Sequence, residues 1–248
     1  MTYNIRHGNP PSGKDGMIDL TQCARVIIGE HADLVALQEV DVNTQRTGRN
    51  LNEIEELARL TGLKYFFFSK SMDYQGGEYG NALLSRFPIK DTFRYELPLG
   101  TSEEQRSIGI IRVELPASKY PLYFASTHLE ISDESVRLLQ VKKILEITSV
   151  YSQQQFILAG DMNSLPLSET IRKLQEGFTL SCNINKCQPT FSSDKPTQTI
   201  DYIMINNRTK SLYNIISYTT KSNVYASDHF PVITVLKGSF VNFQLFTF

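Results

Sequence analysis

Residues 155–164 read QFILAGDMNS, an apolar run that a glycine closes and that an acid and an amide follow. A short apolar run bounded by turn-forming residues is typical of a buried strand, so we expect a strand over residues 155–159. Gly160 permits a tight backbone, and Asp161 and Asn163 direct their side chains toward related space. The pair is equally typical of a simple turn, because Asp and Asn form local hydrogen bonds with the backbone. The stretch therefore predicts a strand whose end carries either a turn or polar site residues.

Strand-like and helix-like patterns alternate on both sides of this stretch. Apolar residues at helical spacing predict helices over residues 18–30, 50–61, 133–151 and 168–175. Strand-like runs cover residues 2–6, 33–40, 64–69, 80–87, 90–96, 106–115, 122–129, 200–205, 212–218 and 230–236. No helical pattern interrupts residues 80–129, so we expect an antiparallel stretch there. The whole pattern, many strands with flanking helices, indicates an α/β or α+β protein.

Length and charge narrow the class of protein. With 248 residues, 41% of them hydrophobic, the chain can bury a full core, and we expect one domain over residues 1–248. The 25 Lys and Arg nearly cancel the 26 Asp and Glu, so tight nonspecific DNA binding is not expected. Residues 239–248 read SFVNFQLFTF, which is typical of an edge strand or a pairing surface, and we assign them no role.

Cysteine and apolar patterns bear on metal content and location. Cys23, Cys182 and Cys187 form no CxxC pair, so we expect no structural zinc site. We expect three unpaired thiols, with a Cys182–Cys187 disulfide as the alternative. No apolar run approaches the ~20 residues that cross a bilayer, which predicts a soluble chain without a transmembrane segment. The chain starts within a strand pattern, so the compartment stays open: cytoplasmic, or exported if an upstream signal was removed.

Acidic and imidazole residues recur where apolar runs end, and strand ends are where groups distant in sequence converge on one cleft. Glu39 follows the run LVALQ and suits a hard cation such as Mg²⁺, although solvated acids at strand ends are common. His128 closes one strand-like run, and His229 precedes another. A lone histidine is more often structural, but two of them near carboxylates provide acid–base chemistry near neutral pH. Asp201 is a suitable orienting carboxylate for one of them.

Seven short motifs then occur in a set order: TYNIRHG at 2–8, LVALQEV at 34–40, YGNALLSR at 79–86, STHLE at 126–130, LAGDMNS at 158–164, TIDYI at 199–203 and SDH at 227–229. Together they resemble the endonuclease/exonuclease/phosphatase superfamily, the group that includes deoxyribonuclease-like, apurinic-site and sphingomyelinase-like enzymes. The resemblance runs from residue 2 to about residue 236. It implies a four-layer α/β/β/α sandwich, two mixed β-sheets flanked by helices, and metal-dependent hydrolysis of a phosphate ester.

The resemblance also implies roles for single residues at the metal end of the site. Glu39 resembles the principal metal ligand, Asn4 the amide beside it, and Asp228 a further acid of the metal and proton network. His229 resembles the histidine that pairs with an aspartate, here Asp201.

At the phosphate end, Asp161 and Asn163 match a GDxN element that positions the nucleophilic water and the scissile phosphate. His128 matches the histidine that contacts phosphate oxygens opposite His229. A phosphodiester and hydroxide are both negative, so Mg²⁺ and donors aimed at the developing charge lower the barrier. We expect His229, held by Asp201, to be the general base, with Asp161 as the alternative.

Three further residues are candidates for substrate contact. Arg46 and Arg106 can present paired donors to phosphate, although surface arginines are the more common case. The segment 70–80, KSMDYQGGEYG, is either a cover for the cleft, with Tyr74 or Tyr79 stacking on a base or sugar, or a hairpin turn with surface aromatics. We expect Arg86 to be structural.

The sequence thus predicts a Mg²⁺-dependent hydrolase of phosphate esters, a phosphodiesterase acting by in-line attack of an activated water, with Mn²⁺ as an alternative ion. A phosphorylated small molecule, a nucleotide, a lipid head group and a nucleic acid all remain candidate substrates. Two alternatives stay open, a nuclease acting on DNA or RNA and an inactive scaffold of the same fold. No protein partner is indicated.

Overall fold

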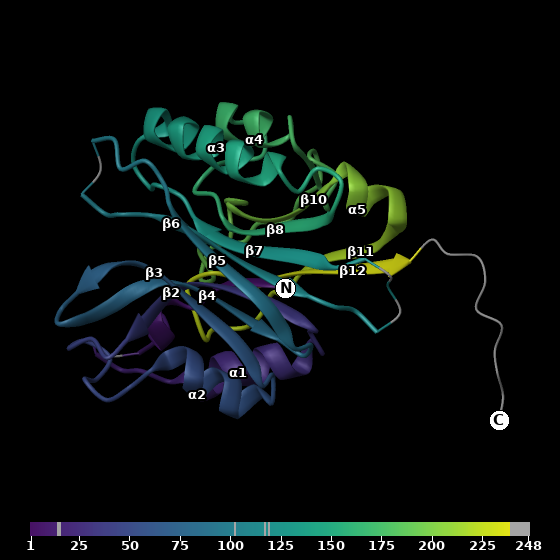
Figure 1. Ribbon diagram of the computed structural model, residues 1–248. Helices are drawn as coiled ribbons and strands as arrows, with labels where there is room; N and C mark the ends of the chain where they lie inside the picture. Colours follow the sequence, from purple (N-terminus) through teal and green to yellow (C-terminus); the bar gives the residue numbers. More distant parts are fainter. Residues whose placement is uncertain (14–15, 102, 117, 119, 239–248) are drawn as a thin grey trace, which may run out of the picture.

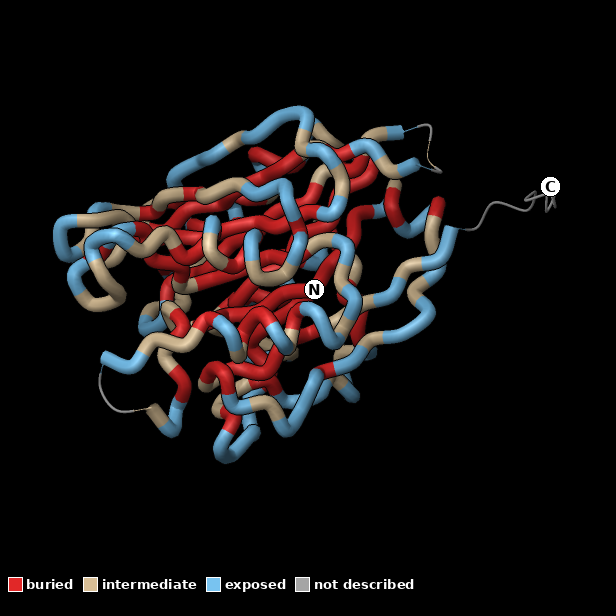
Figure 2. Tube along the Cα trace, turned by 90° about the horizontal axis from the view of Figure 1, so that it is seen from below, coloured by how far each residue is buried: buried red, intermediate tan, exposed pale blue. Residues whose placement is uncertain are grey.

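The computed structural model consists of two six-stranded sheets packed face to face with helices on both outer faces (Figure 1). It describes residues 1–13, 16–101, 103–116, 118 and 120–238. The buried segments are mainly the strands, which form the interior of the molecule (Figure 2). This is the four-layer α/β/β/α sandwich that the motif resemblance implies.

The first sheet has the strand order β11-β12-β1-β2-β4-β3. The central pair β1 and β2 is parallel, whereas β12 and β4 run antiparallel to their neighbours, so the sheet is mixed. Its strands are β1 (Thr2–Asn4), β2 (Leu34–Val42), β3 (Tyr65–Tyr74), β4 (Gly77–Ser85), β11 (Tyr213–Thr220) and β12 (Val232–Gly238).

The second sheet has the order β5-β6-β7-β8-β10-β9 and is mixed for the same reason, with β7 and β8 parallel and the other pairs antiparallel. Its strands are β5 (Ile89–Glu96), β6 (Ser107–Val113), β7 (Leu122–His128), β8 (Gln155–Asp161), β9 (Phe178–Leu180) and β10 (Asp201–Asn206).

Helices cover the outer face of each sheet (Figure 1). Helices α1 (Leu20–Gly29) and α2 (Glu53–Thr61) pack on the first sheet, and α3 (Glu134–Ser149) and α4 (Glu169–Leu174) on the second. Each begins at a side-chain cap, and the cap of α4 is Ser168, whose hydroxyl accepts a hydrogen bond from Ile171 N at 3.2 Å. A short helix, α5 (Asn207–Leu212), links β10 to β11.

A polar layer lies between the sheets, beside the apolar core that they share. Gln38 of the first sheet donates from Nε2 to Ser126 Oγ of the second at 3.0 Å, and Asn81 donates from Nδ2 to Ser107 O at 3.0 Å. All four residues are buried, so each bond satisfies a group that would otherwise be costly. These contacts fix how the two sheets lie on each other near the ends of β2 and β7.

Most predicted elements are present within one or two residues of their expected bounds, and the differences have physical causes. The antiparallel stretch over residues 80–129 holds for β5, β6 and β7, but β4 lies in the other sheet and pairs with β2 and β3. Periodicity describes single strands and does not say which sheet they join. Strand β9 and helix α5 were not predicted; residues 207–212, NRTKSL, contain one apolar residue and therefore show no helical periodicity.

The expectation of three unpaired thiols is wrong. Cys182 and Cys187 form a disulfide, since the turn between them, closed by Lys186 N donating to Asn183 O at 2.7 Å, brings their Cα atoms to 5.3 Å. Cys23 is free and buried, as expected.

Arg86, for which we expect a structural role, lies in an exposed ion pair with Asp33 at 2.7 Å. Within the part of the chain that the structure describes, no helix has the length and apolar character that crossing a membrane requires. The predicted edge strand at residues 239–248 falls outside the described residues.

Candidate active site

Strand register brings the polar residues of the second sheet together. His128 ends β7, Asp161 ends β8 and Asp201 begins β10, and the three are neighbours across the sheet in the pairings His128↔Asp161 and Asp201↔Asp161. Gly160 makes this close approach possible, since a Cβ there would lie 2.0 Å from Thr127 O and its φ is +156°. Residues far apart in sequence thus form one row across the ends of three neighbouring strands.

Asn4 joins this row to the first sheet. Asn4 ends β1, and its Nδ2 donates to Glu39 Oε1 at 2.9 Å and to Asp161 Oδ2 at 3.1 Å. Its Oδ1 accepts a hydrogen bond from Arg6 N at 3.1 Å. The amide is therefore a buried bridge between two carboxylates that belong to different sheets.

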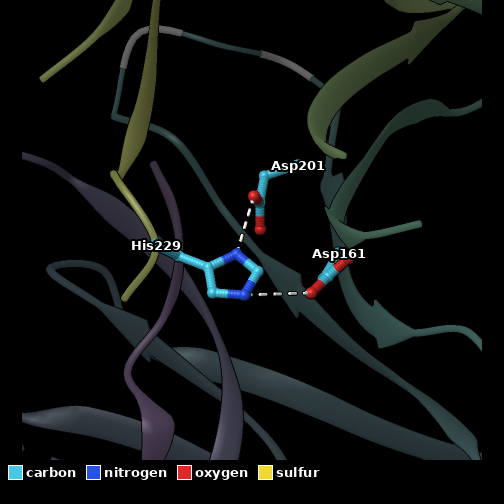
Figure 3. A group of neighbouring side chains, drawn as sticks. All are labelled: Asp161, Asp201 and His229. Atoms are coloured by element: carbon cyan, nitrogen blue, oxygen red, sulfur yellow. Dashed lines mark hydrogen bonds and ion pairs between the residues drawn. The ribbon is translucent and has the colours of Figure 1, made fainter. Parts of the chain in front are cut away.

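His229 lies between two aspartates (Figure 3). Its Nδ1 is 2.9 Å from Asp201 Oδ2, and its Nε2 is 3.7 Å from Asp161 Oδ2. His128 Nε2 is 3.6 Å from the same Asp161 oxygen. Because 3.6 and 3.7 Å are longer than a hydrogen bond, both imidazole Nε2 atoms remain available to another oxygen.

The surroundings of these groups give them different charges. Burial opposes protonation of His229, but the charge and hydrogen bond of Asp201 and the charge of Asp161 outweigh it and raise its pKa to about 10. Burial, and then the nearby Asp201, raises the pKa of Asp161 to about 7. Burial, with Arg106 and His229 close by, holds the pKa of His128 well below its usual range. One histidine is therefore cationic at neutral pH and the other is neutral.

Left-handed backbone conformations concentrate around this cluster. Glu39 has φ +56° at a bulge in β2, Asn163 has φ +46°, and Arg6 and His7 have φ +47° and +42°. Side chains other than glycine adopt this region only at a cost, and such residues are common at functional sites. At Glu39 the bulge turns the carboxylate toward Asn4 and the cleft.

The remaining predicted acid and amide lie on the cleft wall. Asp228 is partly exposed, and its Oδ2 is 3.5 Å from Arg6 Nε. Asn163 N donates to Asp161 Oδ1 at 2.9 Å, and Asn163 Nδ2 donates to Leu129 O at 2.9 Å. The turn alternative for Asp161 and Asn163 is thus realised, and both residues also line the cleft, where the turn holds the aspartate in place.

The two arginines differ in how far their donors are used. Arg46 makes a paired contact with buried Asp41, at 2.7 Å from Nε and 2.8 Å from Nη2, and its guanidinium lies over the rings of Tyr74 and Tyr79 at 4.6 and 5.5 Å. Arg106 is buried and pairs with Glu104 at 2.8 Å, and its Nε has no hydrogen-bond partner among the described residues. The geometry gives Arg106 more free donor capacity than Arg46.

Residues 70–80 form the tip of the β3–β4 hairpin, with the turn at Gln75 and Gly76. The hairpin alternative is therefore correct for the backbone. Both tyrosines nevertheless reach the cleft, a hollow of about 600 Å³. The predicted residues that line this cleft are Glu39, Arg46, Tyr74, Tyr79, Arg106, His128, Asp161, Asn163, Asp228 and His229.

Asn4 and Asp201 do not line the cleft but contact residues that do. The structure adds three residues that the sequence analysis missed. Phe191 packs its ring on His229 at 4.8 Å, Arg6 approaches Asp228, and buried Ser227 donates from Oγ to Asn4 O at 2.7 Å. Arg6 and Ser227 stand inside the motifs TYNIRHG and SDH, whereas nothing in the sequence pointed to Phe191.

The charges of the site favour a cation. Asp161, Asp201 and His229 offer ligand atoms that lie within 4.8 Å of one another. Glu39 and Asp228 add two partly exposed carboxylates on the same cleft, and burial raises the pKa of Glu39. Hard carboxylate oxygens next to solvent are what Mg²⁺ and Mn²⁺ prefer. The donor set therefore fits a hard divalent ion.

Comparison with known proteins agrees with this fold. A family model described as the Endonuclease/Exonuclease/phosphatase family matches residues 1–229. A protein of that description from Beutenbergia cavernae DSM 12333 has a similar solved structure, with a TM-score of 0.78 and 21% identity over 96% of this chain and 70% of that one. No curated protein sequence matches.

Two other similar structures carry more specific names. A mannosyl-6-phosphatase from Bacteroides thetaiotaomicron VPI-5482 has a TM-score of 0.72 and 16% identity over 95% of this chain and 98% of that one. The human Nocturnin catalytic domain with bound sulfate has a TM-score of 0.70 and 17% identity over 96% and 92% of the two chains. At these identities the likeness concerns the fold alone.

Proposed function

Because this chain belongs to the endonuclease/exonuclease/phosphatase family, whose members hydrolyse phosphoesters and generally use divalent metals, we propose that it is a Mg²⁺-dependent phosphodiesterase. In the proposed reaction a water attacks phosphorus in line with the leaving oxygen. Mn²⁺ is the expected substitute ion, because it shares the preference for oxygen ligands.

One observation carries the proposal, the arrangement of His229 between Asp201 and Asp161 at the floor of a cleft. Asp201 Oδ2 holds Nδ1 at 2.9 Å, so the ring is fixed with Nε2 toward Asp161. A histidine oriented by one buried carboxylate and facing a second is an acid–base arrangement that a merely structural histidine does not need.

Glu39 and Asp228 would hold the metal ion, and Asn4 would position Glu39 through its hydrogen bond. We place the ion there because Oδ2 of Asp161 already accepts a hydrogen bond from Asn4, and Oδ2 of Asp201 already accepts one from His229. When bound, a divalent ion stabilises negative charge that develops on phosphate oxygens.

The chain's own donors are arranged around the same phosphate position. The raised pKa of His229 keeps it protonated at neutral pH, and His128 is neutral, so each can donate from Nε2 to a phosphate oxygen. Arg106 adds a buried cation with a free Nε.

The pKa shifts of Asp161 and His229 also indicate which group accepts the proton of the attacking water. We propose that Asp161 takes the proton of the attacking water, because its pKa of about 7 suits a base near neutral pH, whereas a protonated His229 cannot accept. The sequence motifs favour His229 as the base, with Asp161 as the alternative. In both assignments His229 is essential.

Hydrolysis of bis-p-nitrophenyl phosphate and p-nitrophenyl phosphate in Mg²⁺, Mn²⁺ or EDTA tests the proposal. We expect metal-dependent release that is faster with the diester and absent in EDTA. Glu39→Gln should lose most of this activity, whereas Glu55→Gln, an exposed acid of α2, should keep it. No metal-dependent release from either ester would instead favour an inactive scaffold. Abasic and plain DNA, RNA, phosphoinositides and sphingomyelin, assayed side by side, test the nuclease alternative.

A further inference from the structure

Three large aliphatic side chains are exposed on the two loops that follow β7 and β8. Ile131 is 67% exposed, Leu165 50% and Leu167 63%. Ile131 stands just after β7, and the two leucines follow β8. Single exposed apolar residues are common on protein surfaces, but three on adjoining loops beside a functional cleft form a surface that water solvates poorly. We call these three residues the apolar rim.

The two loops that carry the apolar rim are fixed to each other. Asn163 Nδ2 donates to Leu129 O at 2.9 Å, and Leu129 N donates to Asp161 O at 3.0 Å. Further along, Thr170 Oγ1 donates to Glu134 Oε1 at 3.2 Å and joins the beginnings of α3 and α4. The loops are therefore held side by side, so the exposure of their aliphatic groups is a feature of an ordered surface.

The apolar rim continues the wall of the cleft. Ile131 and Leu165 line the same cleft as His128 and Asp161. Phe191 and Ile200 add apolar surface to it. A phosphate held by the two histidines would thus have an apolar surface beside it and carboxylates beneath it.

We propose that the substrate carries an apolar group esterified to its phosphate, an aliphatic or aromatic alcohol, and that the apolar rim binds this group. The inference rests on the proposed function, since it places the phosphate at the floor of the cleft. A sugar or a polynucleotide would find few hydrogen-bond partners among three aliphatic side chains and would leave them solvated. An alkyl or aryl group removes them from water, which is the source of the preference.

A series of diesters that share the p-nitrophenyl reporter tests this. The second ester group is methyl, hexyl, octyl or thymidine, so that the leaving group stays the same while the apolar surface changes. We expect kcat/KM for the octyl ester to exceed that for the methyl ester by at least tenfold, and the nucleoside ester to resemble the methyl ester. Ile131→Ser with Leu165→Ser, at the two rim residues that line the cleft, should lower the octyl-to-methyl ratio about tenfold, which corresponds to about 1.4 kcal/mol.

Two matched variants control for surface changes. Ile131→Met with Leu165→Met keeps apolar side chains at the same two positions and should keep the ratio. Ile216→Ser with Val150→Ser changes two equally exposed aliphatic residues, on β11 and after α3, that do not line the cleft, and should also keep it. An unchanged ratio in the rim variant, or equal rates for all chain lengths in the wild type, would overturn the proposal.

Binding separates this inference from the proposed function. In EDTA, octyl phosphate below its critical micelle concentration should bind at least tenfold more tightly than methyl phosphate, and the rim variant should lose this difference. That result supports the apolar rim even if no ester is hydrolysed, in which case only the proposed function fails. Equal binding of both phosphates refutes the rim. Binding to phosphatidylcholine vesicles without binding to monomeric octyl phosphate also refutes it, because the rim would then contact a lipid surface.

Discussion

His229 shows how a buried side chain acquires its orientation and its charge from two neighbours. Asp201 contacts Nδ1 and Asp161 faces Nε2, so the ring orientation and the protonation state follow from the positions of two carboxylates. The aromatic ring of Phe191 covers the imidazole at 4.8 Å and limits its freedom. Each contact comes from a different strand or loop.

The first prediction concerns this histidine. His229→Ala should lower kcat by about 10²- to 10⁴-fold, the usual contribution of a positioned acid–base group, while Mg²⁺ affinity stays near that of the wild type. Steady-state kinetics with bis-p-nitrophenyl phosphate and a Mg²⁺ titration measure the two effects. His31→Ala, at an exposed histidine outside the cleft, is the control and should retain activity. Full activity in His229→Ala would remove it from the mechanism.

Glu53 is a buried acid outside the cleft. It begins α2 and accepts a hydrogen bond from Asp41 N at 2.8 Å, while its second carboxylate oxygen, Oε1, has no partner among the described residues. Burial, and then the charge of Asp41, raises its pKa well above the usual 4.5 in spite of that hydrogen bond. The fold therefore favours neutral Glu53.

A pH-dependent stability follows from Glu53. A carboxyl group whose pKa is higher in the folded than in the unfolded state stabilises the fold. This contribution is fully present below pH 4.5, the usual pKa of the group, and is lost as the pH rises through the pKa of the folded state. Glu53→Gln keeps an acceptor for Asp41 N and removes the titration. Its melting temperature should equal that of the wild type near pH 4 and exceed it by several degrees at pH 8, as measured by calorimetry.

Glu55→Gln is the matched control, because Glu55 is an exposed acid of the same first turn. The difference between its melting temperature and that of the wild type should stay constant between pH 4 and pH 8. If the difference between Glu53→Gln and the wild type were also constant over this range, the pKa of Glu53 would not change on folding.

At the level of the elements, the two sheets approach each other closely where β6 faces β3. A Cβ at Gly109 would lie 2.5 Å from Ser69 Cβ, and neither strand can move alone because both are hydrogen-bonded into sheets. The local periodicity of β6 does not distinguish this glycine from any other strand residue. The close approach exists only once the sheets are stacked.

Gly109→Ala should therefore destabilise the protein by about 1–3 kcal/mol through overpacking. The measurement is urea unfolding at neutral pH, where the midpoint should fall. Gly29→Ala, at a glycine of α1 with nothing within 4 Å of an added Cβ, is the control and should be neutral or stabilise by up to about 1 kcal/mol. Equal midpoints for Gly109→Ala and the wild type would contradict the close packing.

On the scale of the whole molecule, the site joins the two halves of the sandwich. Asn4 and Glu39 come from the first sheet, and His128, Asp161 and Asp201 from the second. Binding at such a site favours the state in which both sheets are packed. Ion binding and global stability should therefore be coupled.

Mg²⁺ at about one hundred times its dissociation constant should stabilise the fold by about 2.7 kcal/mol, or roughly 5–10 °C in melting temperature. Thermal unfolding in Mg²⁺ and in EDTA measures the shift. Glu39→Gln should lose most of it, and Glu55→Gln should retain it. A shift of full size in Glu39→Gln would place the ion elsewhere, with the group Asp161, Asp201 and His229 as the next candidate.

Local patterns were sufficient for the strand ends and for the polar residues that stand on them, because a strand, its apolar run and its terminal Gly-Asp are set by neighbours in sequence. Family motifs extended this to the sandwich and to many of the residues that line the cleft. The contact between Asn4 and Asp161, which are 157 residues apart, and the ring of Phe191 on His229 were beyond local patterns. The charges of the histidines and the ordered apolar rim were beyond them as well. These features depend on how two sheets and their loops pack, and packing energies are shared among residues that no sequence window contains together.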